Sequence, residues 1–393
     1  MKKVKLGVIG IGNMGSVHCL NVVKGACPEM ELVAVADTNP ARLEWAKAEL
    51  PDSVARFATA EELLDSGLAE AVIVAVPHYF HPPIAQEAFR RKIHVLTEKP
   101  AGVYTRQVRE MNEAAEKSGV VFGIMWNQRT NHIFRKMKEL VSSGKYGEIR
   151  RTNWIITLWY RSQAYYDSGD WRATWAGEGG GVLMNQCPHQ LDLWQWICGM
   201  PKTVDAKIQY GKWHNIEVED DVSAFVQYEN GATGVFIAST GDAHGTNRFE
   251  ILMDRAKLVA ERGKLQVLEF ETSIDEFTYG GSSVGELKAF EPELVTDGKD
   301  EEHVGVVNAF AAAILRGEPL VADGREGIRE LTLANAMYLS DWLGHAVELP
   351  FDEELYYNEL SKRIANSKGK HAAETSPQKD KAPNVQDRWK VRW

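Results

Sequence analysis

Three glycines near the start of the chain constrain its fold more than any other feature of the sequence. Gly10, Gly12 and Gly15 follow an apolar run at residues 4–9, and a helical pattern continues from Gly12 to about residue 24. In a strand–turn–helix unit the first glycine permits a tight turn, the second lets a pyrophosphate approach the backbone, and the third lets helix and strand pack closely. This context predicts a dinucleotide-binding turn and disfavours the alternative of a plain cluster of turn glycines.

An acidic residue follows the second apolar run, at the position where a dinucleotide-binding turn needs an acceptor for the ribose hydroxyls. Asp37 ends a second apolar run, at residues 31–36. An acidic residue at this spacing accepts hydrogen bonds from the adenosine ribose hydroxyls. Its charge repels a 2′-phosphate, and Thr38 and Asn39 follow it where an arginine would favour that phosphate, so we expect NAD. NADP is the less favoured alternative, since Arg42 is a nearby cation.

Strand-like and helical stretches alternate over the first 126 residues. The expected strands are apolar throughout and lie at residues 4–9, 31–36, 71–76, 93–97 and 120–125. The expected helices lie at residues 12–24, 40–50, 61–66, 83–91 and 103–117. Apolar strands separated by helices indicate a parallel sheet covered on both faces. We therefore expect an α/β protein with a doubly wound Rossmann domain over residues 1–126.

The pattern changes after residue 127, where β-branched and aromatic residues become frequent. Helices are expected at residues 133–143 and 180–198, and strands at residues 148–160, 203–210, 222–228, 233–239, 248–253 and 264–270. Two more helices, at residues 302–315 and 324–343, are expected to close this half. We predict an α+β domain with an open, mostly antiparallel sheet over residues 127–350, for substrate binding and oligomerisation. Residues 351–393 form a C-terminal extension whose polar composition predicts a disordered tail, unless Trp389 and Trp393 anchor it on a neighbouring subunit.

Composition and charge limit the classes of partner. A chain of 393 residues suits two domains, and 45 basic against 55 acidic side chains give a net charge of −10. The sequence has no long basic stripe, which argues against nucleic acid or an anionic membrane surface as the main partner. No stretch approaches the roughly 20 apolar residues of a membrane span. The four cysteines form no C-x-x-C pair, which suits a reducing compartment, so we expect a cytoplasmic protein.

The motif Glu98-Lys99-Pro100 directly follows the expected strand at residues 93–97. Ligands bind at the carboxyl ends of strands in this architecture. A lysine there can donate to a substrate hydroxyl or carbonyl, and burial beside a nicotinamide cation would lower its pKa and ease proton exchange. The alternative is a surface salt bridge between Lys99 and Glu98.

A histidine is the second candidate for proton chemistry. His189 lies on the helix expected after Gly179, Gly180 and Gly181, with Asn185 four residues before it and Asp192 three after it. On one continuous helix these three side chains would share a face. Histidine is the usual group for taking a hydroxyl proton. The alternatives are a hydrogen-bonded core histidine and a metal site with Asp192, which lacks further spaced ligands, so no metal is expected.

The segment between these motifs is rich in aromatic and basic residues. Sugar C–H faces stack on aromatic rings, so a sugar pocket is one interpretation; packing of the sheet or of a subunit interface is the other. Arg161 and Arg172 could bind an anionic substituent, or could simply pair with Asp167 and Asp170. The candidate substrate-binding residues are Trp159, Tyr160, Arg161, Trp171, Arg172, Trp175 and Asn185.

In combination, the glycine turn, Glu98-Lys99-Pro100, Asn127-Gln128-Arg129 and the triple glycine followed by His189-x-x-Asp192 resemble the Gfo/Idh/MocA oxidoreductases over about residues 4–345. That family includes glucose–fructose oxidoreductase and inositol dehydrogenase. The resemblance implies a Rossmann domain and an open-sheet substrate domain that share an active site. It places the catalytic lysine at Lys99 and the catalytic histidine at His189.

The same resemblance implies a set of cofactor contacts and one departure. Pro77 and His81 match the loop beside the nicotinamide. Inositol dehydrogenase-like members carry an aspartate where this chain has Asn185, which can bind a hydroxyl but cannot take its proton. The residues expected to contact the cofactor are Gly10, Gly12, Asn13, Met14, Gly15, Asp37, Thr38, Pro77, His78, His81, Glu98, Lys99 and Asn127.

Together these features predict an NAD-dependent dehydrogenase that oxidises a secondary hydroxyl of a sugar, cyclitol or glycoside. Two alternatives come from the same family: a glycosidase that retains NAD and acts through transient oxidation, and a non-catalytic dinucleotide-binding sensor. The presence of both Lys99 and His189 disfavours the sensor. The family also implies a homo-oligomer, either a dimer or a tetramer.

Overall fold

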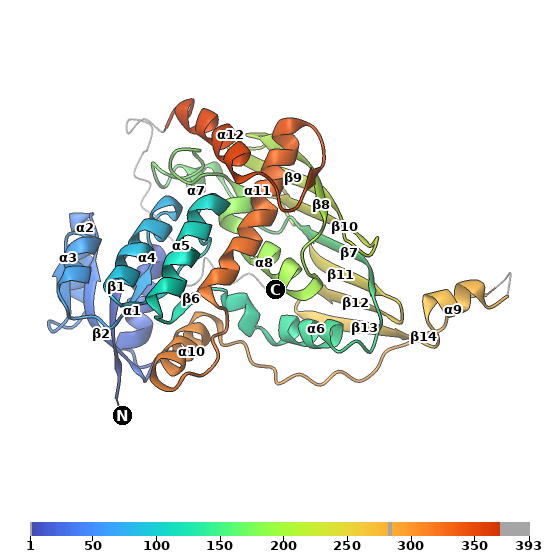
Figure 1. Ribbon diagram of the computed structural model, residues 1–393, viewed down its shortest axis with the longest axis horizontal. Helices are drawn as coiled ribbons and strands as arrows, with labels where there is room; N and C mark the ends of the chain where they lie inside the picture. The colour runs from blue at the N-terminus through green and yellow to red at the C-terminus, as the bar shows by residue number, and fades with distance from the viewer. Residues whose placement is uncertain (1, 282–284, 370–393) are drawn as a thin grey trace. The chain divides into compact units, whose positions relative to one another are not determined.

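The computed structural model describes residues 2–281 and 285–369, which form two compact units (Figure 1). The first unit comprises Met1–Thr130, Gly177–Gly179 and Asp300–Thr332. The second comprises, of the described residues, 131–176, 180–281, 285–299 and 333–369. Each unit has its own sheet.

The first unit is built on a six-stranded sheet in the order β3-β2-β1-β4-β5-β6. Every neighbouring pair in it is parallel. This order, which reverses between β1 and β4, is that of the Rossmann fold, and it confirms the expected domain class. The strands are β1 (Val4–Ile9), β2 (Met30–Ala36), β3 (Ala55–Phe57), β4 (Ala71–Val74), β5 (His94–Thr97) and β6 (Phe122–Ile124).

Local signals explain where the helices of this unit begin and end. Asn39 accepts the Ala41 N–H at the start of α2, Thr59 and Glu62 form a capping box at α3, and Gly119 ends α5 with a φ of 67°. The α-helices are α1 (Asn13–Val23), α2 (Pro40–Glu49), α3 (Ala60–Asp65), α4 (His81–Arg90), α5 (Thr105–Ser118) and α10 (Glu302–Arg316). The 3₁₀ turns are η1 (His78–Phe80), η2 (Asn127–Thr130) and η4 (Gly324–Glu326).

Helix α10 differs from the sequence expectation in its packing partner. The helix expected at residues 302–315 is present, but it was expected to close the second half of the chain. Val306, Val307 and Phe310 of α10 instead share one buried cluster with Val4 and Leu6 of β1. Apolar periodicity predicts that a helix buries one face, but it does not say which sheet that face covers.

The second unit is built on a nine-stranded sheet in the order β14-β13-β12-β11-β7-β10-β9-β8-β15. Neighbouring strands are antiparallel except for the parallel pair β7 and β10, as expected for an open, mostly antiparallel sheet. The strands are β7 (Ile149–Ile156), β8 (Thr203–Tyr210), β9 (Glu219–Gln227), β10 (Thr233–Ser239), β11 (Asn247–Met253), β12 (Ala256–Glu261), β13 (Lys264–Phe270), β14 (Ala289–Phe290) and β15 (Val347–Glu348).

Helices cover this sheet, and α6 and α8 lie side by side over it (Figure 1). The ring of Trp154 on β7 stacks on Phe249 of β11 with centroids 4.2 Å apart, so the alternating aromatics of β7 pack the unit's core. The helices are α6 (His132–Ser142), α7 (Gln163–Tyr166), the π-helix η3 (Val182–Gln186), α8 (Pro188–Cys198), α9 (Ile274–Tyr279), α11 (Gly327–Leu343), which contributes to both units, and α12 (Glu353–Ala365).

The C-terminal extension is partly helical, which the sequence analysis did not predict. Asp352 accepts the N–H groups of Glu354 and Leu355 at the start of α12, and Tyr356 and Leu360 are fully buried. These two buried side chains, four residues apart, form the face through which this mostly polar helix packs on the protein. Trp389 and Trp393, expected as anchors, lie outside the described residues. Over residues 2–281 and 285–369, no helix is long and apolar enough to cross a membrane.

Candidate functional site

The glycine turn has the shape that a pyrophosphate site requires. Gly10 has a φ of 84°, and a Cβ there would lie 2.5 Å from the Ala75 carbonyl oxygen; a Cβ on Gly15 would collide with the Gly10 carbonyl. A Cβ on Gly12, in contrast, would have no atom within 4 Å. No side chain caps α1 at Gly12, so the N–H groups of its first turn lack a side-chain acceptor. The turn leaves open space beside unpaired donors, as an anion needs.

Asp37 is held against this turn and keeps spare acceptor capacity. Its Oδ2 accepts the Ile11 N–H at 2.8 Å and its Oδ1 accepts the Asn39 N–H at 2.9 Å. A carboxylate offers about four lone-pair positions, so two remain for ribose hydroxyls. Arg42 is the cation for which NADP was kept as an alternative. It donates to the carbonyl oxygens of Ile11 and Gly12 at 2.6 and 3.0 Å. Two of its N–H groups are thus already used in the protein.

Glu98 lies inside the first unit, with only 6% of its surface exposed. Its Oε1 lies 2.7 Å from Nε2 of His18 on α1, and its Oε2 accepts the Lys99 N–H at 3.2 Å. Burial raises the pKa of this carboxyl, but the His18 hydrogen bond and nearby positive charges, among them Lys99, outweigh burial and hold the pKa at about 2. The side chain expected to touch the cofactor is therefore directed at His18 and at the backbone N–H of Lys99.

A second histidine, His303 of α10, belongs to the same cluster. Its ring centroid is 5.8 Å from that of His18. Burial lowers the pKa of His303 to about 4, assisted by the charges of His18 and Lys99 and opposed by Glu98. His303 is therefore neutral near pH 7. No sequence spacing links residues 18, 98 and 303, so sequence reasoning could not find this cluster.

His81 and His78, expected beside the nicotinamide, make backbone contacts. His81 is buried, with Nδ1 2.7 Å from the Pro100 carbonyl oxygen and Nε2 2.7 Å from the Val76 carbonyl oxygen. Nδ1 of His78 lies 3.1 Å from the Glu178 carbonyl oxygen. Both ring nitrogens of His81 are engaged, so its side chain supports the loop after Lys99 and has no nitrogen left for a cofactor. A contact between His81 and the cofactor stays a prediction, and it could use only the ring carbons or the backbone.

Two buried polar atoms lie at the carboxyl end of β6. Among the residues that the structure describes, Oδ1 of Asn127 and Oε1 of Gln128 have no hydrogen-bond partner, although both residues are at most 5% exposed. A buried acceptor without a donor costs free energy unless a ligand supplies one. Asn127 thus fits its expected contact with a cofactor. The third residue of the motif, Arg129, is already paired with Glu326, Nη1 to Oε2, at 3.0 Å.

His189 and Asn185 lie in the second unit on two consecutive helices. Asn185 belongs to η3, whereas His189 is the second residue of α8, which begins at Pro188. Proline cannot continue a preceding helix but suits the first position of a new one, so it forces the break. The expected single helix through residues 180–198 is therefore wrong: Asn185 lies on η3, whereas His189 and Asp192 both lie on α8. Both side chains remain half-buried.

Asp192, the possible metal partner of His189, is buried and accepts the Gln195 side-chain amide at 3.0 Å. In the described part of the chain, no group of three or more His, Cys, Asp and Glu side chains could hold a metal ion.

Glu219 of β9 anchors the π-helix, and sequence reasoning missed it. Its two oxygens accept the Gly181 N–H at 3.0 and 2.9 Å, and Oε1 also accepts the Leu183 N–H at 2.9 Å. Burial raises the pKa of Glu219 to about 7, against the lowering effect of the nearby Tyr338 hydroxyl and of these N–H groups. The buried Glu219 carboxyl group thus fixes the start of the segment that carries Asn185, through its hydrogen bonds with Gly181 and Leu183.

Some residues of the aromatic segment are packed in the interior and others are exposed. Trp175 is 6% exposed, donates Nε1–H to the Glu217 carbonyl oxygen, and packs edge-on against Tyr338 and Trp342, so the packing alternative holds for it. Trp159 is 4% exposed. Tyr160 is 52% exposed and is an aromatic surface open to a ligand.

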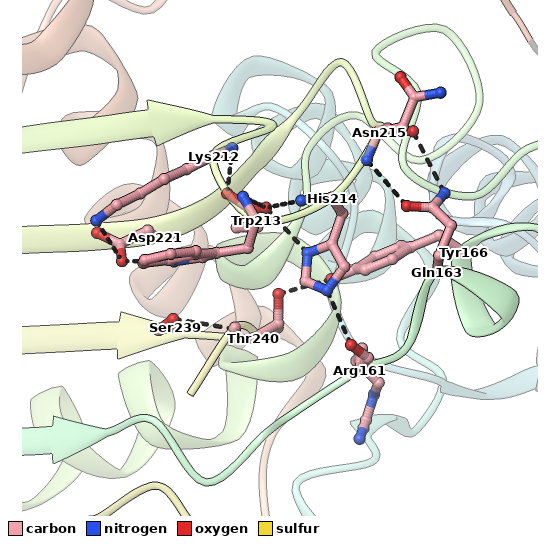
Figure 2. A network of polar contacts seen from close by, with 12 residues as sticks. Arg161, Gln163, Tyr166, Lys212, Trp213, His214, Asn215, Asp221, Ser239 and Thr240 are labelled. Carbon is pink, nitrogen blue, oxygen red and sulfur yellow. Dashed lines mark hydrogen bonds and ion pairs between the residues drawn. The ribbon is translucent and has the colours of Figure 1, made fainter. Parts of the chain in front are cut away.

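A polar network fixes the segment from Arg161 to Tyr166 (Figure 2). His214 places Nδ1 2.9 Å from Oδ2 of Asp220 and Nε2 2.8 Å from the Arg161 carbonyl oxygen. The ring thus bridges the Asp220 carboxylate and the backbone at Arg161. The Tyr166 and Thr240 hydroxyls pair at 2.8 Å in the same network. The backbone that carries Tyr160 and Arg161 is therefore held in place.

Comparison with known proteins defines the class of this chain. Residues 4–125 match the model of an oxidoreductase family with an NAD-binding Rossmann fold, and residues 134–259 match the GFO/IDH/MocA C-terminal domain. The protein is an NAD(P)-dependent oxidoreductase. The chain belongs to the Gfo/Idh/MocA family, as its motifs indicated.

Relatives of this chain act on ring compounds. It is 30% identical over 247 residues to a 1-carboxy-3-chloro-3,4-dihydroxycyclohexa-1,5-diene dehydrogenase of Comamonas testosteroni, covering 61% of this chain and 59% of that protein. It is 24% identical to a myo-inositol 2-dehydrogenase of Thermotoga maritima, covering 85% and 95%. The crystal structure of the WlbA dehydrogenase of Bordetella pertussis, in complex with NADH and UDP-GlcNAcA, superposes with a TM-score of 0.75 at 26% identity, covering 89% of this chain and 100% of that one.

Proposed function

We propose that this protein is an NAD-dependent dehydrogenase that oxidises a secondary hydroxyl of a sugar, cyclitol or glycoside. One observation carries the proposal: the open turn at Gly12, Lys99 and Asn127 follow the carboxyl ends of β1, β5 and β6 in one parallel sheet. That edge is where this architecture binds dinucleotides. Bound NAD would supply the acceptor for the hydride of the carbinol carbon.

Lys99 and His189 divide the proton chemistry in this proposal. The Lys99 ammonium donates a hydrogen bond to the substrate oxygen and stabilises the negative charge that develops there. The neutral His189 imidazole accepts the hydroxyl proton as the carbonyl forms. Asn185 orients the substrate but takes no proton, since an amide has no basic site. The reverse reduction uses the same groups in the opposite sense.

The preference for NAD over NADP rests on Asp37. Its carboxylate lies at the glycine turn, where it accepts the Ile11 N–H, and a 2′-phosphate beside it would meet like charge. Arg42 could offset that charge only through the N–H groups that do not already bind carbonyl oxygens. The carboxylate of Asp37 therefore favours NAD, whose adenosine ribose carries free hydroxyls, over NADP.

The assignment of a sugar-like substrate draws on the relatives, which act on hydroxylated rings, and on the exposed ring of Tyr160. A panel of sugars, cyclitols and glycosides with NAD or NADP tests it. We expect net NADH to accumulate with at least one member, and NADPH to form more slowly. Release of an aglycone without net NADH would indicate a glycosidase, and NAD binding without any turnover would indicate a sensor; either outcome would contradict the proposal.

A further inference from the structure

The π-helix that carries Asn185 begins against the carboxyl group of one buried residue. Glu219, which is fully buried on β9, accepts the N–H groups of Gly181 and Leu183. The carbonyl oxygen of Gly181 in turn accepts the Asn185 N–H at 3.0 Å. Two consecutive hydrogen bonds therefore connect the Glu219 carboxyl group with the backbone of Asn185.

The two glycines before this helix allow its close approach to the rest of the second unit. A Cβ on Gly180 would collide with the Tyr338 hydroxyl, and a Cβ on Gly181 would collide with the Glu219 carbonyl oxygen. The start of η3 is thus confined between β9 and α11. π-Helices are rare and frequently occur at functional sites, so we asked what a change at Glu219 would do to this one.

The hold of Glu219 on η3 depends on its charge. Burial raises the pKa of this carboxyl to about 7, whereas its contacts with the N–H groups of Leu183 and Gly181 lower it. A contact that lowers the pKa of an acid stabilises its ionised form, and by linkage ionisation strengthens the contact. A proton on the carboxyl group would also occupy one of the two oxygens that accept the Gly181 N–H. Loss of that proton near pH 7 should therefore tighten the hold on η3.

The other titratable groups that face Glu219 are tyrosines. Tyr338 belongs to α11, and Tyr210 of β8 pairs in register with Glu219. Burial and neighbouring carboxylates raise the pKa of both hydroxyls, so both stay neutral near pH 7. The Tyr210 hydroxyl donates to Asp341 at 2.8 Å, and η3 itself carries no titratable side chain. The other acidic residues on this stretch have different partners: Glu217 accepts the Trp175 N–H, Asp220 pairs with His214 and Asp221 pairs with Lys212.

We propose that Glu219 is a positioning residue whose negative charge holds η3, and with it Asn185, in the form that binds the substrate. The inference deepens the proposed function and rests on it, because Asn185 orients the substrate there. Substrate affinity should increase as pH rises through 7. The free energy of unfolding should change in the opposite sense, because unfolding releases the carboxyl group from burial. A residue that served folding alone would produce only that second effect.

Hydrogen exchange tests the positioning step without any ligand. Exchange of the peptide spanning residues 181–187 is followed by mass spectrometry at pH 6 and pH 8 and corrected for the intrinsic rate at each pH. We expect its protection to rise about three- to tenfold in the wild type, as for one hydrogen bond whose acceptor gains a charge, and to stay constant in Glu219→Gln. Glu229→Gln is the matched control at an exposed site and should follow the wild type. Protection that stays constant in the wild type, or that rises equally in Glu219→Gln, overturns the inference.

Kinetics test the link to the substrate. KM for the best substrate of the panel should fall about three- to tenfold between pH 6 and pH 8 in the wild type, and this change should vanish in Glu219→Gln. In Tyr338→Phe the inflection should move to higher pH, because the Tyr338 hydroxyl lowers the pKa of Glu219. His189 is present in every variant, so its own titration cancels in the comparison.

The outcomes separate this inference from the proposed function. A thermal melt confirms that each variant folds, and if Glu219→Gln does not fold, the wild type and Tyr338→Phe carry the test. The same pH dependence of KM in all of the folded proteins overturns the inference and leaves the dehydrogenase standing. If no member of the panel is oxidised, the proposed function fails, and hydrogen exchange still decides whether Glu219 positions η3.

Discussion

His18 and Glu98 lie 2.7 Å apart, Nε2 to Oε1, although 80 residues of chain separate them. His18 sits on the helix that begins at the glycine turn, and Glu98 immediately precedes Lys99. One hydrogen bond thus connects the backbone proposed to hold the pyrophosphate with the residue proposed to hold the substrate oxygen. We expect the pair to act on Lys99 through its position and charge, since both side chains are buried.

The first prediction concerns Glu98→Gln. An amide keeps the shape of the side chain but removes the charge beside Lys99, so the ammonium loses a stabilising neighbour. We expect kcat to fall about tenfold, Kd for NAD to change little, and the limb of the pH–rate profile that reports Lys99 to move to lower pH. A merely structural residue would change the melting temperature without moving that limb. An unshifted profile would show that Glu98 does not act through Lys99.

The second prediction concerns the glycine turn. Gly12→Ala should fold, because a Cβ there meets no protein atom within 4 Å. The added methyl group occupies the space proposed for pyrophosphate, so Kd for NAD should rise at least tenfold. Gly15→Ala provides the contrast: its Cβ would collide with the Gly10 carbonyl, so this variant should lose stability. Tight NAD binding by a well-folded Gly12→Ala protein would contradict the proposed site.

The third prediction concerns cofactor choice. Asp37→Asn keeps an oxygen that can accept from Ile11 or Asn39 but removes the negative charge. Repulsion of a 2′-phosphate should weaken by about 1 kcal/mol or more, so the ratio of kcat/KM for NADP to that for NAD should rise about tenfold. Kinetics with both cofactors check this, and an unchanged ratio would mean that Asp37 does not face the ribose.

The fourth prediction follows from Glu219, whose pKa burial raises to about 7. Because the folded pKa lies above the unfolded one, the neutral carboxyl stabilises the fold below about pH 4.5, and that contribution is lost as pH rises through 7. At about 1.4 kcal/mol per unit the difference is roughly 3 kcal/mol. Glu219→Gln cannot ionise, so the wild type should lose stability relative to it between about pH 5 and pH 8 in denaturant titrations. Glu229→Gln, at an exposed site, is the control and should follow the wild type.

Much of the fold could be predicted from the sequence because its signals are local. The expected ends of β8, β10 and β13 agree with the structure to the residue, since each strand carries its own burial pattern. β12 was missed because the Asp254-Arg255 turn before it lacks glycine, proline and asparagine. The three-residue β3 is only half-buried and was too short to show a pattern.

The residues of the candidate site also differ in whether a local sequence signal could identify them. Gly12 and Asp37 could be identified because their spacing within one βαβ unit has a fixed physical meaning. His18, His303 and Glu219 could not, because each becomes relevant only through a partner that is distant in the sequence. Asn127 is intermediate: its motif singled it out, but only burial shows that its Oδ1 lacks a donor.

The most direct test of the account is the rate of NADH formation by Lys99→Ala and His189→Ala at saturating NAD, with the best substrate of the panel. We predict that each variant binds NAD normally and loses about 10²- to 10⁴-fold in turnover, as expected when a group that transfers or stabilises a proton is removed. Lys92→Ala and His345→Ala, at sites outside the proposed machinery, should keep wild-type rates. Near-normal turnover in both Lys99→Ala and His189→Ala would contradict the mechanism.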